Sequence, residues 1–209
     1  LVGSVMCIRD SNQAELLDIV GECAKAGNPD MVYEFASTSK VSFPGSGIAA
    51  MATSAANIAD VKKTMTIQTI GHDKINQLRH VRYFKDINGL KAKMKAHAEI
   101  MRPKFEATLK VLEDELSGLE VGTWVKPYGG YFISFDAMEG CAKRIVSLCK
   151  EAGLVMTGAG ATFPYGRDPK DSNIRIAPSF PTPDEMEQAA DLFALCVKLA
   201  SVEKLLETK

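Results

Sequence analysis

A lysine stands among hydroxyl side chains directly after a short apolar segment. Residues 31–36 alternate as a strand does, and they are followed by Ser37, Thr38, Ser39 and Lys40. A lysine held in a tight turn behind a buried strand is partly desolvated, which disfavours its ammonium form and makes the amine available as a nucleophile. Hydroxyls one and three residues before the lysine, together with the amides of the turn, suit a phosphate group. The pattern therefore predicts a site for a phosphorylated aldehyde that is anchored covalently to the lysine.

Pyridoxal 5′-phosphate makes both demands, since its aldehyde needs an amine and its phosphate needs hydrogen-bond donors. The alternative is an ordinary surface lysine in a turn rich in serine and threonine. Taken alone, the four residues favour that alternative. The motifs that accompany them along the chain favour the cofactor site.

Four segments of the chain resemble, in the same order, segments of the class I aminotransferases, which are pyridoxal-phosphate enzymes of fold type I. Residues 37–45 resemble the segment that carries the cofactor lysine, and residues 126–132 resemble the Pro-x-Gly-Gly-x-Phe segment that leads into a strand. Residues 158–163 are similar to the glycine loop of the small domain, and residues 173–177 to the strand that carries the substrate-carboxylate arginine. Each motif is weak by itself, whereas their order and spacing are specific.

Within this family, the sequence of residues 35–47, 76–80 and 173–181 is most similar to that of the bacterial aspartate aminotransferases. The resemblance implies that Lys40 is the catalytic residue. It also implies that the cofactor is bound by Ser37, Ser39 and Lys40.

The same resemblance implies that Arg175 binds the substrate. The residue stands among apolar neighbours in an expected strand, and a planar guanidinium binds a carboxylate through two parallel hydrogen bonds. The alternative is an exposed strand arginine that pairs with Asp168 or Asp171. Without the resemblance that alternative would be preferred.

One departure from the family pattern concerns the phosphate. Many class I aminotransferases have a phosphate-binding arginine seven or eight residues after the cofactor lysine, where this sequence has Gly47 and Ile48. Either Ser37, Ser39, backbone amides and the upstream part of the protein hold the phosphate, or cofactor binding is weakened. The match to the subgroup around residues 45–47 favours the first possibility.

The remaining candidate residues predict no metal site. His72, His80 and His97 lack the spacing of a ligand set, and His97 is expected to be an interior histidine. Arg79 and Arg82 lie three residues apart on one helix face, where they form a solvated basic face or, alternatively, reach a second substrate carboxylate.

Periodicity predicts the elements that position these residues. A long helix is expected over residues 87–116, with Pro103 bending it or marking a joint between two helices. A first helix is expected to begin at a cap at Ser11 or Asn12 and to run through Cys23. Later helices are expected over residues 54–66, 73–84 and 140–152, and a last one from Pro183 towards the end of the chain. Strands are expected over 31–36, 48–51, 123–126, 130–136, 154–157 and 173–177, with loops over 37–47 and 158–166.

Helices that alternate with short strands indicate an α/β protein. The resemblance makes it fold type I aminotransferase-like: the later part of a large doubly wound domain, followed by a small α/β domain. Residues 1–100 are expected to belong to the cofactor-binding domain, including the lysine loop and the start of the bridging helix. Residues 101–209 are expected to form the small C-terminal domain.

Composition fits this class. The chain has 25 basic and 26 acidic side chains and is 46% hydrophobic, which excludes a disordered chain and argues against a protein that neutralises nucleic-acid phosphates. No run approaches the roughly 20 apolar residues of a membrane span. The five cysteines include no pair at metal or redox spacing, so a reducing, cytoplasmic location is expected.

The resemblance predicts a pyridoxal-phosphate-dependent aminotransferase, present here as a fragment, that transfers an amino group between aspartate and 2-oxoglutarate. Its expected partners are amino-acid and 2-oxo-acid substrates and a second copy of the chain in a homodimer, with no nucleic acid and no membrane. The alternatives are a lyase or decarboxylase of the same fold and a non-catalytic sensing domain of a regulator. Residues 1–10 match nothing expected before the first helix, and the groups that contact the cofactor ring are expected upstream.

Overall fold

The computed structural model describes residues 17–207. They divide into two compact units, of which the first ends at His97 and the second begins at Ala98. The assignment of residues 1–100 and 101–209 to a cofactor-binding domain and a small domain stays a prediction.

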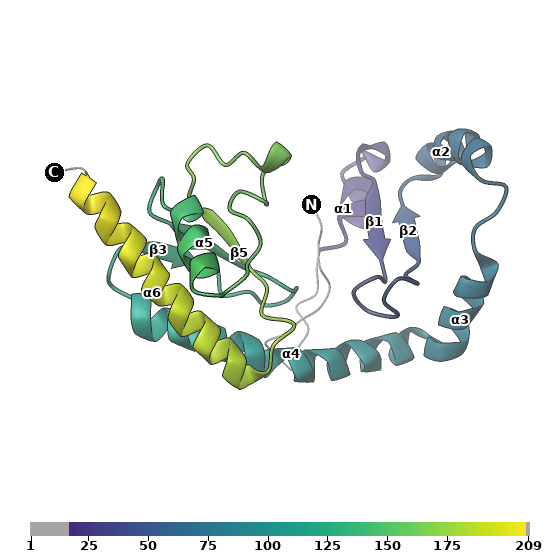
Figure 1. The fold of residues 1–209 in the computed structure, drawn as a ribbon. Helices are drawn as coiled ribbons and strands as arrows, with labels where there is room; N and C mark the ends of the chain where they lie inside the picture. Colours follow the sequence, from purple (N-terminus) through teal and green to yellow (C-terminus); the bar gives the residue numbers. More distant parts are fainter. Residues whose placement is uncertain (1–16, 208–209) are drawn as a thin grey trace. The chain divides into compact units, whose positions relative to one another are not determined.

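The first unit contains a two-stranded antiparallel sheet and several helices (Figure 1). Strand β1 (Glu34–Ser37) pairs with β2 (Ala49–Ala52) so that Ser37 lies opposite Ala49. The other elements are α1 (Ile19–Lys25), a 3-10 turn (Pro29–Met31), α2 (Ala55–Gln68), α3 (Lys74–Phe84) and the start of α4 (Ile87–Leu116).

Side chains predicted to begin two of these helices do so. The Ser54 hydroxyl accepts a hydrogen bond from the Asn57 amide at the start of α2, and the Asp73 carboxylate accepts one from the Asn76 amide at the start of α3. Helix α1 instead begins after Asp18, whose carboxylate accepts from the Gly21 amide. The caps predicted at residues 11 and 12 lie outside the described residues.

The strand in front of the lysine is exposed, so the prediction of a buried strand is wrong for this chain. All four residues of β1 are exposed, and Phe35 retains 73% of its accessible surface. The physical reason is that a ladder of only two short strands leaves both faces of the sheet open to solvent.

The second unit is built on a three-stranded antiparallel sheet in the order β3 (Gly122–Trp124), β4 (Ile133–Ala137), β5 (Asn173–Ile176). Helices α5 (Ala142–Glu151) and α6 (Pro183–Glu207) and a 3-10 turn (Pro164–Gly166) complete it, together with the later part of α4. Residues 154–157 form no strand, contrary to prediction. The Leu154 amide donates to the Cys149 carbonyl at the end of α5, so the segment begins as a helix cap rather than as a sheet partner.

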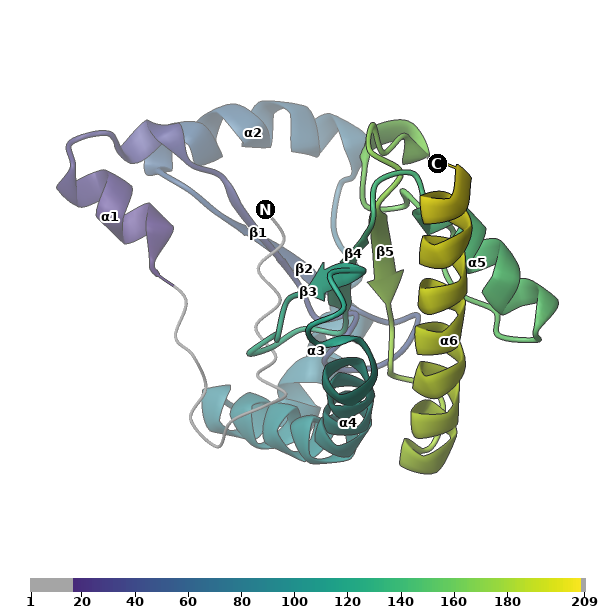
Figure 2. The ribbon, with the colours of Figure 1, turned by 90° about the vertical axis from the view of Figure 1, so that its left-hand side faces the viewer.

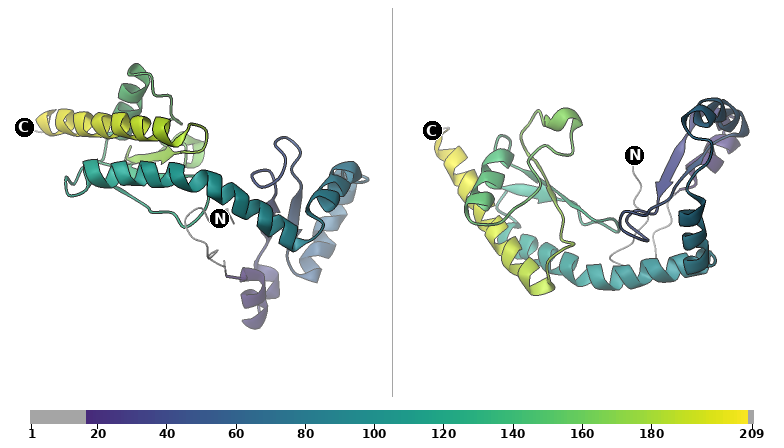
Figure 3. Two further views of the ribbon diagram at one scale, coloured as in Figure 1. Left: turned by 90° about the horizontal axis from the view of Figure 1, so that it is seen from below. Right: turned by 45° about the vertical axis from the view of Figure 1, so that its right-hand side comes forward.

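The sheet and three helices enclose one apolar core (Figure 2). Phe135 on β4, Ile145 on α5 and Val197 on α6 are fully buried. Helix α6 runs alongside α4, where Lys198 forms an ion pair with Glu115 at 2.6 Å (Figure 3). The predicted stripe of the long helix is confirmed, because five of its members are buried: Met94, Met101, Phe105, Leu112 and Leu116.

Pro103 lies inside one continuous helix and not at a joint between two. None of the helices in the described part of the chain is long and apolar enough to cross a membrane.

Three of the cysteines behave as small apolar residues, as predicted. Cys141, Cys149 and Cys196 are buried and free. Burial, followed by the neighbouring Cys196 thiol, raises the pKa of Cys149 to about 12. Burial also raises the pKa of Cys141, so the thiols of Cys141 and Cys149 stay protonated near neutral pH.

Candidate functional site

Lys40 lies in a tight turn that closes directly behind β1. The amides of Val41 and Ser42 both donate to the Thr38 carbonyl, at 2.9 and 2.8 Å. The loop is closed at its neck by a pair of bonds: the Thr38 amide donates to the Ile48 carbonyl, and the Ile48 amide donates to the Thr38 hydroxyl, both at 2.9 Å. Hydrogen bonds within the loop thus close the turn around the lysine.

The hydroxyls of Ser37 and Ser39 meet beside this turn. Their Oγ atoms are 2.8 Å apart, and the Ser39 amide donates to Ser37 Oγ at 3.2 Å. Ser37, Ser39 and Lys40 are all exposed. The expectation of a partly desolvated lysine is therefore wrong for the described chain, because the strand that precedes it is itself uncovered.

These three residues fit a phosphorylated aldehyde. An exposed amine follows two hydroxyls that meet at the end of β1 and the start of the turn, and these are groups that covalent attachment and phosphate binding use. The structure thus brings the predicted cofactor residues together.

The loop leaves no room for a side chain at Gly47, one of the two positions where the family pattern has its phosphate-binding arginine. A Cβ atom placed on Gly47 would lie 2.9 Å from both the Cα and the amide nitrogen of Ser39. Any side chain at residue 47 would therefore push the loop away from the lysine turn. The loop returns across the backbone of Ser39 only because residue 47 is glycine.

Helix α3 supplies contacts to the lysine loop that the sequence analysis missed. Asn76 Nδ2 donates to the carbonyl of Ser46 at 2.8 Å and lies 3.3 Å from that of Gly47. His80 is buried, and its Nε2 atom contacts the hydroxyls of Ser42 and Thr38. The sequence shows Asn76 and His80 four residues apart on one helix face, which was the available signal.

Arg175 lies in the second unit, at the wall of a cavity of about 190 Å³ between β5, the 154–157 segment and α6. Its guanidinium carbon lies 4.4 Å from the centre of the Phe132 ring, a cation–π distance, and Nη2 donates to the Thr157 hydroxyl at 3.4 Å. Its Nε atom is buried without a hydrogen-bond partner among the described residues. The guanidinium forms no ion pair among the described residues, so its charge is unpaired at the wall of this cavity.

The alternative ion pairs of Arg175 are not formed in the described chain. Asp168 accepts hydrogen bonds from the amides of Lys170, Ser172 and Asn173, and these bonds, led by that of Asn173, lower the pKa of its carboxyl group. Asp171 lies 3.9 Å from the ammonium of Lys143 instead. Both carboxylates are therefore occupied elsewhere.

Asn173, two residues before Arg175, ties the glycine loop to the sheet. It is buried, it accepts from the Thr162 hydroxyl at 2.6 Å, and its Nδ2 donates to Asp136 at 2.8 Å and to Ser134 at 3.0 Å. This network fixes the strand on which Arg175 stands.

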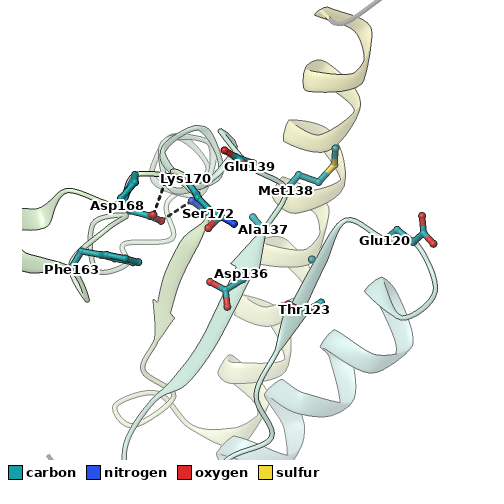
Figure 4. A pocket seen from close by; sticks show the side chains of 12 residues that line it. Glu120, Thr123, Asp136, Ala137, Met138, Glu139, Phe163, Asp168, Lys170 and Ser172 are labelled. Carbon is teal, nitrogen blue, oxygen red and sulfur yellow. Dashed lines mark hydrogen bonds between the residues drawn. The ribbon is translucent and has the colours of Figure 1, made fainter. Parts of the chain in front are cut away.

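A larger hollow of about 750 Å³ lies in the same unit. Figure 4 shows the Asp168 carboxylate turned towards the backbone of Lys170 and Ser172 at its edge. Four of its twelve lining residues are acidic, but no cluster of histidine, cysteine and carboxylate groups among the described residues suits a metal ion. Arg79 and Arg82 are exposed, and His97 is half-buried, with a pKa lowered by burial and by Lys93.

Comparison with known families agrees with this geometry. The family model described as aspartate amino-transferase matches residues 7–209. The chain belongs to this family. An aspartate aminotransferase from Corynebacterium glutamicum is 44% identical over 189 residues, which are 90% of this chain and 44% of the relative.

Solved structures show the same fold. The crystal structure of an aspartate transaminase from Corynebacterium glutamicum has a TM-score of 0.91 and 42% identity, over 96% of this chain and 47% of that one. An α-aminoadipate aminotransferase from Thermus thermophilus, complexed with N-(5′-phosphopyridoxyl)-L-leucine, has a TM-score of 0.77 at 17% identity and covers 95% of this chain and 49% of its own. The predicted aminotransferase fold of type I is confirmed. The chain spans about half the length of these relatives.

Proposed function

We propose that the protein to which this chain belongs is a pyridoxal-phosphate-dependent aminotransferase that moves an amino group between aspartate and 2-oxoglutarate. The observation that carries the proposal is the lysine turn, where the hydroxyls of Ser37 and Ser39 meet directly before the exposed Lys40 in a chain of this family. The name of the Corynebacterium glutamicum relative supports aspartate as the substrate.

Each residue has a distinct task in this proposal. Bound pyridoxal phosphate supplies an aldehyde for the amino group and a conjugated ring that accepts electrons from the substrate α-carbon. Ser37 and Ser39 would donate hydrogen bonds to the phosphate, and Lys40 Nζ would hold the aldehyde carbon. The amine of Lys40 would also take the proton from the substrate α-carbon and return it, as general base and acid.

Arg175 orients the substrate. The Nη groups of its guanidinium bind the α-carboxylate through two parallel hydrogen bonds and so fix the direction of the breaking bond. A dicarboxylate substrate also needs a second cation, because a buried unpaired carboxylate costs several kcal/mol. Arg79 and Arg82 are candidates within this chain.

The wider setting belongs to the same proposal. We infer a homodimer, as the resemblance implies, and a cytoplasmic location, which the free buried thiols support.

Steady-state kinetics on the complete gene product test the substrate. Amino transfer to 2-oxoglutarate is measured from aspartate, alanine and phenylalanine, with Lys40→Ala as the inactive control. Aspartate is expected to exceed the other two in kcat/KM by about a hundredfold, the scale of a charge-specific contact. Comparable efficiency on all three would contradict the aspartate assignment, and an absence of amino transfer would contradict the aminotransferase.

A further inference from the structure

Both ends of the turn that carries Lys40 converge on a single nitrogen atom. The Ser42 hydroxyl lies 2.7 Å from His80 Nε2, and the Thr38 hydroxyl lies 3.2 Å from the same atom. Thr38 is the first residue of the turn and Ser42 is its last, since the Ser42 amide donates back to the Thr38 carbonyl. Lys40 is the middle residue between them.

The other ring nitrogen determines how this contact works. His80 Nδ1 lies 2.9 Å from the carbonyl oxygen of Asn76, one helical turn earlier in α3. A carbonyl only accepts, so Nδ1 carries a proton, and in the neutral imidazole Nε2 is then the acceptor. Either hydroxyl can donate to it: Ser42 is the closer at 2.7 Å and also lies 3.0 Å from the Thr38 carbonyl and hydroxyl, while the Thr38 hydroxyl is 3.2 Å from Nε2.

Packing keeps the ring in this orientation. His80 retains only 4% of its accessible surface. Its ring meets Phe43 edge-on at 5.4 Å between centroids, and Phe84 lies 6.0 Å away. A ring enclosed in this way has little freedom to rotate Nε2 away from the two hydroxyls.

The same helix face also holds the far side of the loop. Asn76 donates to the Ser46 carbonyl and so fixes the segment that returns towards β2. Helix α3 therefore contacts the lysine loop at two places. Asn76 binds the Ser46 carbonyl, and His80 contacts the turn itself.

We propose that His80 is a positioning residue for Lys40. It accepts a hydrogen bond from the turn through Nε2 and thereby fixes the position of Lys40 in the turn. The proposal rests on the proposed function for the role of Lys40. The contact of His80 Nε2 with the hydroxyls of Thr38 and Ser42, called the clamp below, does not depend on that function. It also assigns a use to a buried histidine that the lysine chemistry does not otherwise involve.

Two substitutions separate the acceptor from the mere volume of the ring. His80→Phe keeps an aromatic ring but removes the acceptor, which leaves the Ser42 and Thr38 hydroxyls without this partner. His80→Gln keeps an acceptor oxygen near the position of Nε2. His72→Phe is the matched control, because His72 is an exposed histidine of the same unit.

The first readout needs no cofactor. Amide hydrogen exchange in the cofactor-free gene product reports the bonds of Val41, Ser42 and Ile48 that close the turn and the neck. His80→Phe is expected to speed their exchange by about tenfold or more, with His80→Gln within threefold of the unsubstituted protein and His72→Phe unchanged. Equal exchange in His80→Phe and the unsubstituted protein would overturn the clamp.

The second readout concerns the lysine. In the cofactor-loaded protein, His80→Phe is expected to change the visible circular dichroism of the bound cofactor. It should also lower kcat by about tenfold with KM for aspartate little changed, since small misplacements of a reacting group cost large factors. His80→Gln is expected to restore both.

These results distinguish the two proposals. If the unsubstituted protein attaches no cofactor at Lys40, the proposed function fails while the exchange data still test the clamp. If it does attach cofactor there and His80→Phe and His80→Gln lose kcat equally, the acceptor role of His80 is overturned.

Discussion

At the scale of single residues, Arg175 makes the sharpest demand on geometry. Its guanidinium lies over Phe132 at the wall of a cavity, so the planar fork is held in place. Arg175→Lys keeps the charge but replaces the planar fork with a point charge. We expect the variant to bind cofactor with an unchanged absorption spectrum and to lose about a hundredfold or more in kcat/KM for aspartate.

Stopped-flow absorbance and steady-state kinetics on the complete gene product measure both quantities. Lys143→Arg, an exchange of the same two residue types at an exposed site, is the control and should behave as the unsubstituted enzyme. Near-normal kinetics for Arg175→Lys would return Arg175 to a structural role.

Proximity in sequence decided which site residues were predictable. Ser37 and Ser39 were predicted as neighbours of Lys40 because they lie within three residues of it. His80 was not, since the hydroxyls it contacts are 42 and 38 residues away in the chain. The spacing of Asn76 and His80 places both on one helix face but does not show which segment that face contacts, and the arginines beside His80 suggested a solvated face instead.

At the scale of elements, the start of a helix was predictable where a side chain caps it. Ser54 and Asp73 cap α2 and α3 as expected, and α4 spans the whole predicted range from Ile87 to Leu116. The segment 154–157 was predicted as a strand from its composition. A strand also needs a hydrogen-bonded partner, and the sequence does not show whether one is present.

The start of α6 offers a test of how much a capping side chain stabilises a helix. The Thr182 amide donates to the Glu185 carboxylate at 2.8 Å, and the Glu185 amide donates back to the Thr182 hydroxyl at 3.3 Å, which is a reciprocal capping box. Thr182→Ala is expected to lower the free energy of unfolding by about 1 kcal/mol, measured by urea denaturation of the complete gene product.

The capping box also predicts a pH dependence. Hydrogen bonds from Thr182 lower the pKa of Glu185 below its usual value of 4.5. Because the folded pKa lies below the unfolded one, the stabilisation is present above pH 4.5 and is lost as the pH falls through the folded pKa. The difference between Glu185→Gln and the unsubstituted protein should therefore shrink in acid. A difference that is independent of pH, or a neutral Thr182→Ala, would contradict the capping box.

At the scale of the whole molecule, the fold class was predictable because four motifs occur in one order along the chain. The exposure of the first unit was not. Alternation in residues 31–36 indicates which side chains favour burial, but not whether another segment covers them. In the described chain β1 is uncovered, and with it Phe35 and Met31, which retain 73% and 75% of their accessible surfaces.

This exposure predicts the behaviour of the 209-residue chain by itself. Uncovered strands and apolar side chains favour association, and roughly half of the length of the relatives is absent from it. We expect the isolated chain to bind a hydrophobic dye strongly, to aggregate in analytical ultracentrifugation and to lack amino transfer. A monodisperse and active 209-residue protein would contradict this expectation.

The central claim is that Lys40 holds the cofactor, and borohydride reduction tests it most directly. Reduction of the complete gene product loaded with pyridoxal phosphate converts the bond between lysine and cofactor into a stable label, which mass spectrometry locates after proteolysis. The label is predicted on the peptide that contains Lys40 and is expected to vanish in Lys40→Ala. A label on another lysine, or none in the presence of cofactor, would contradict the account.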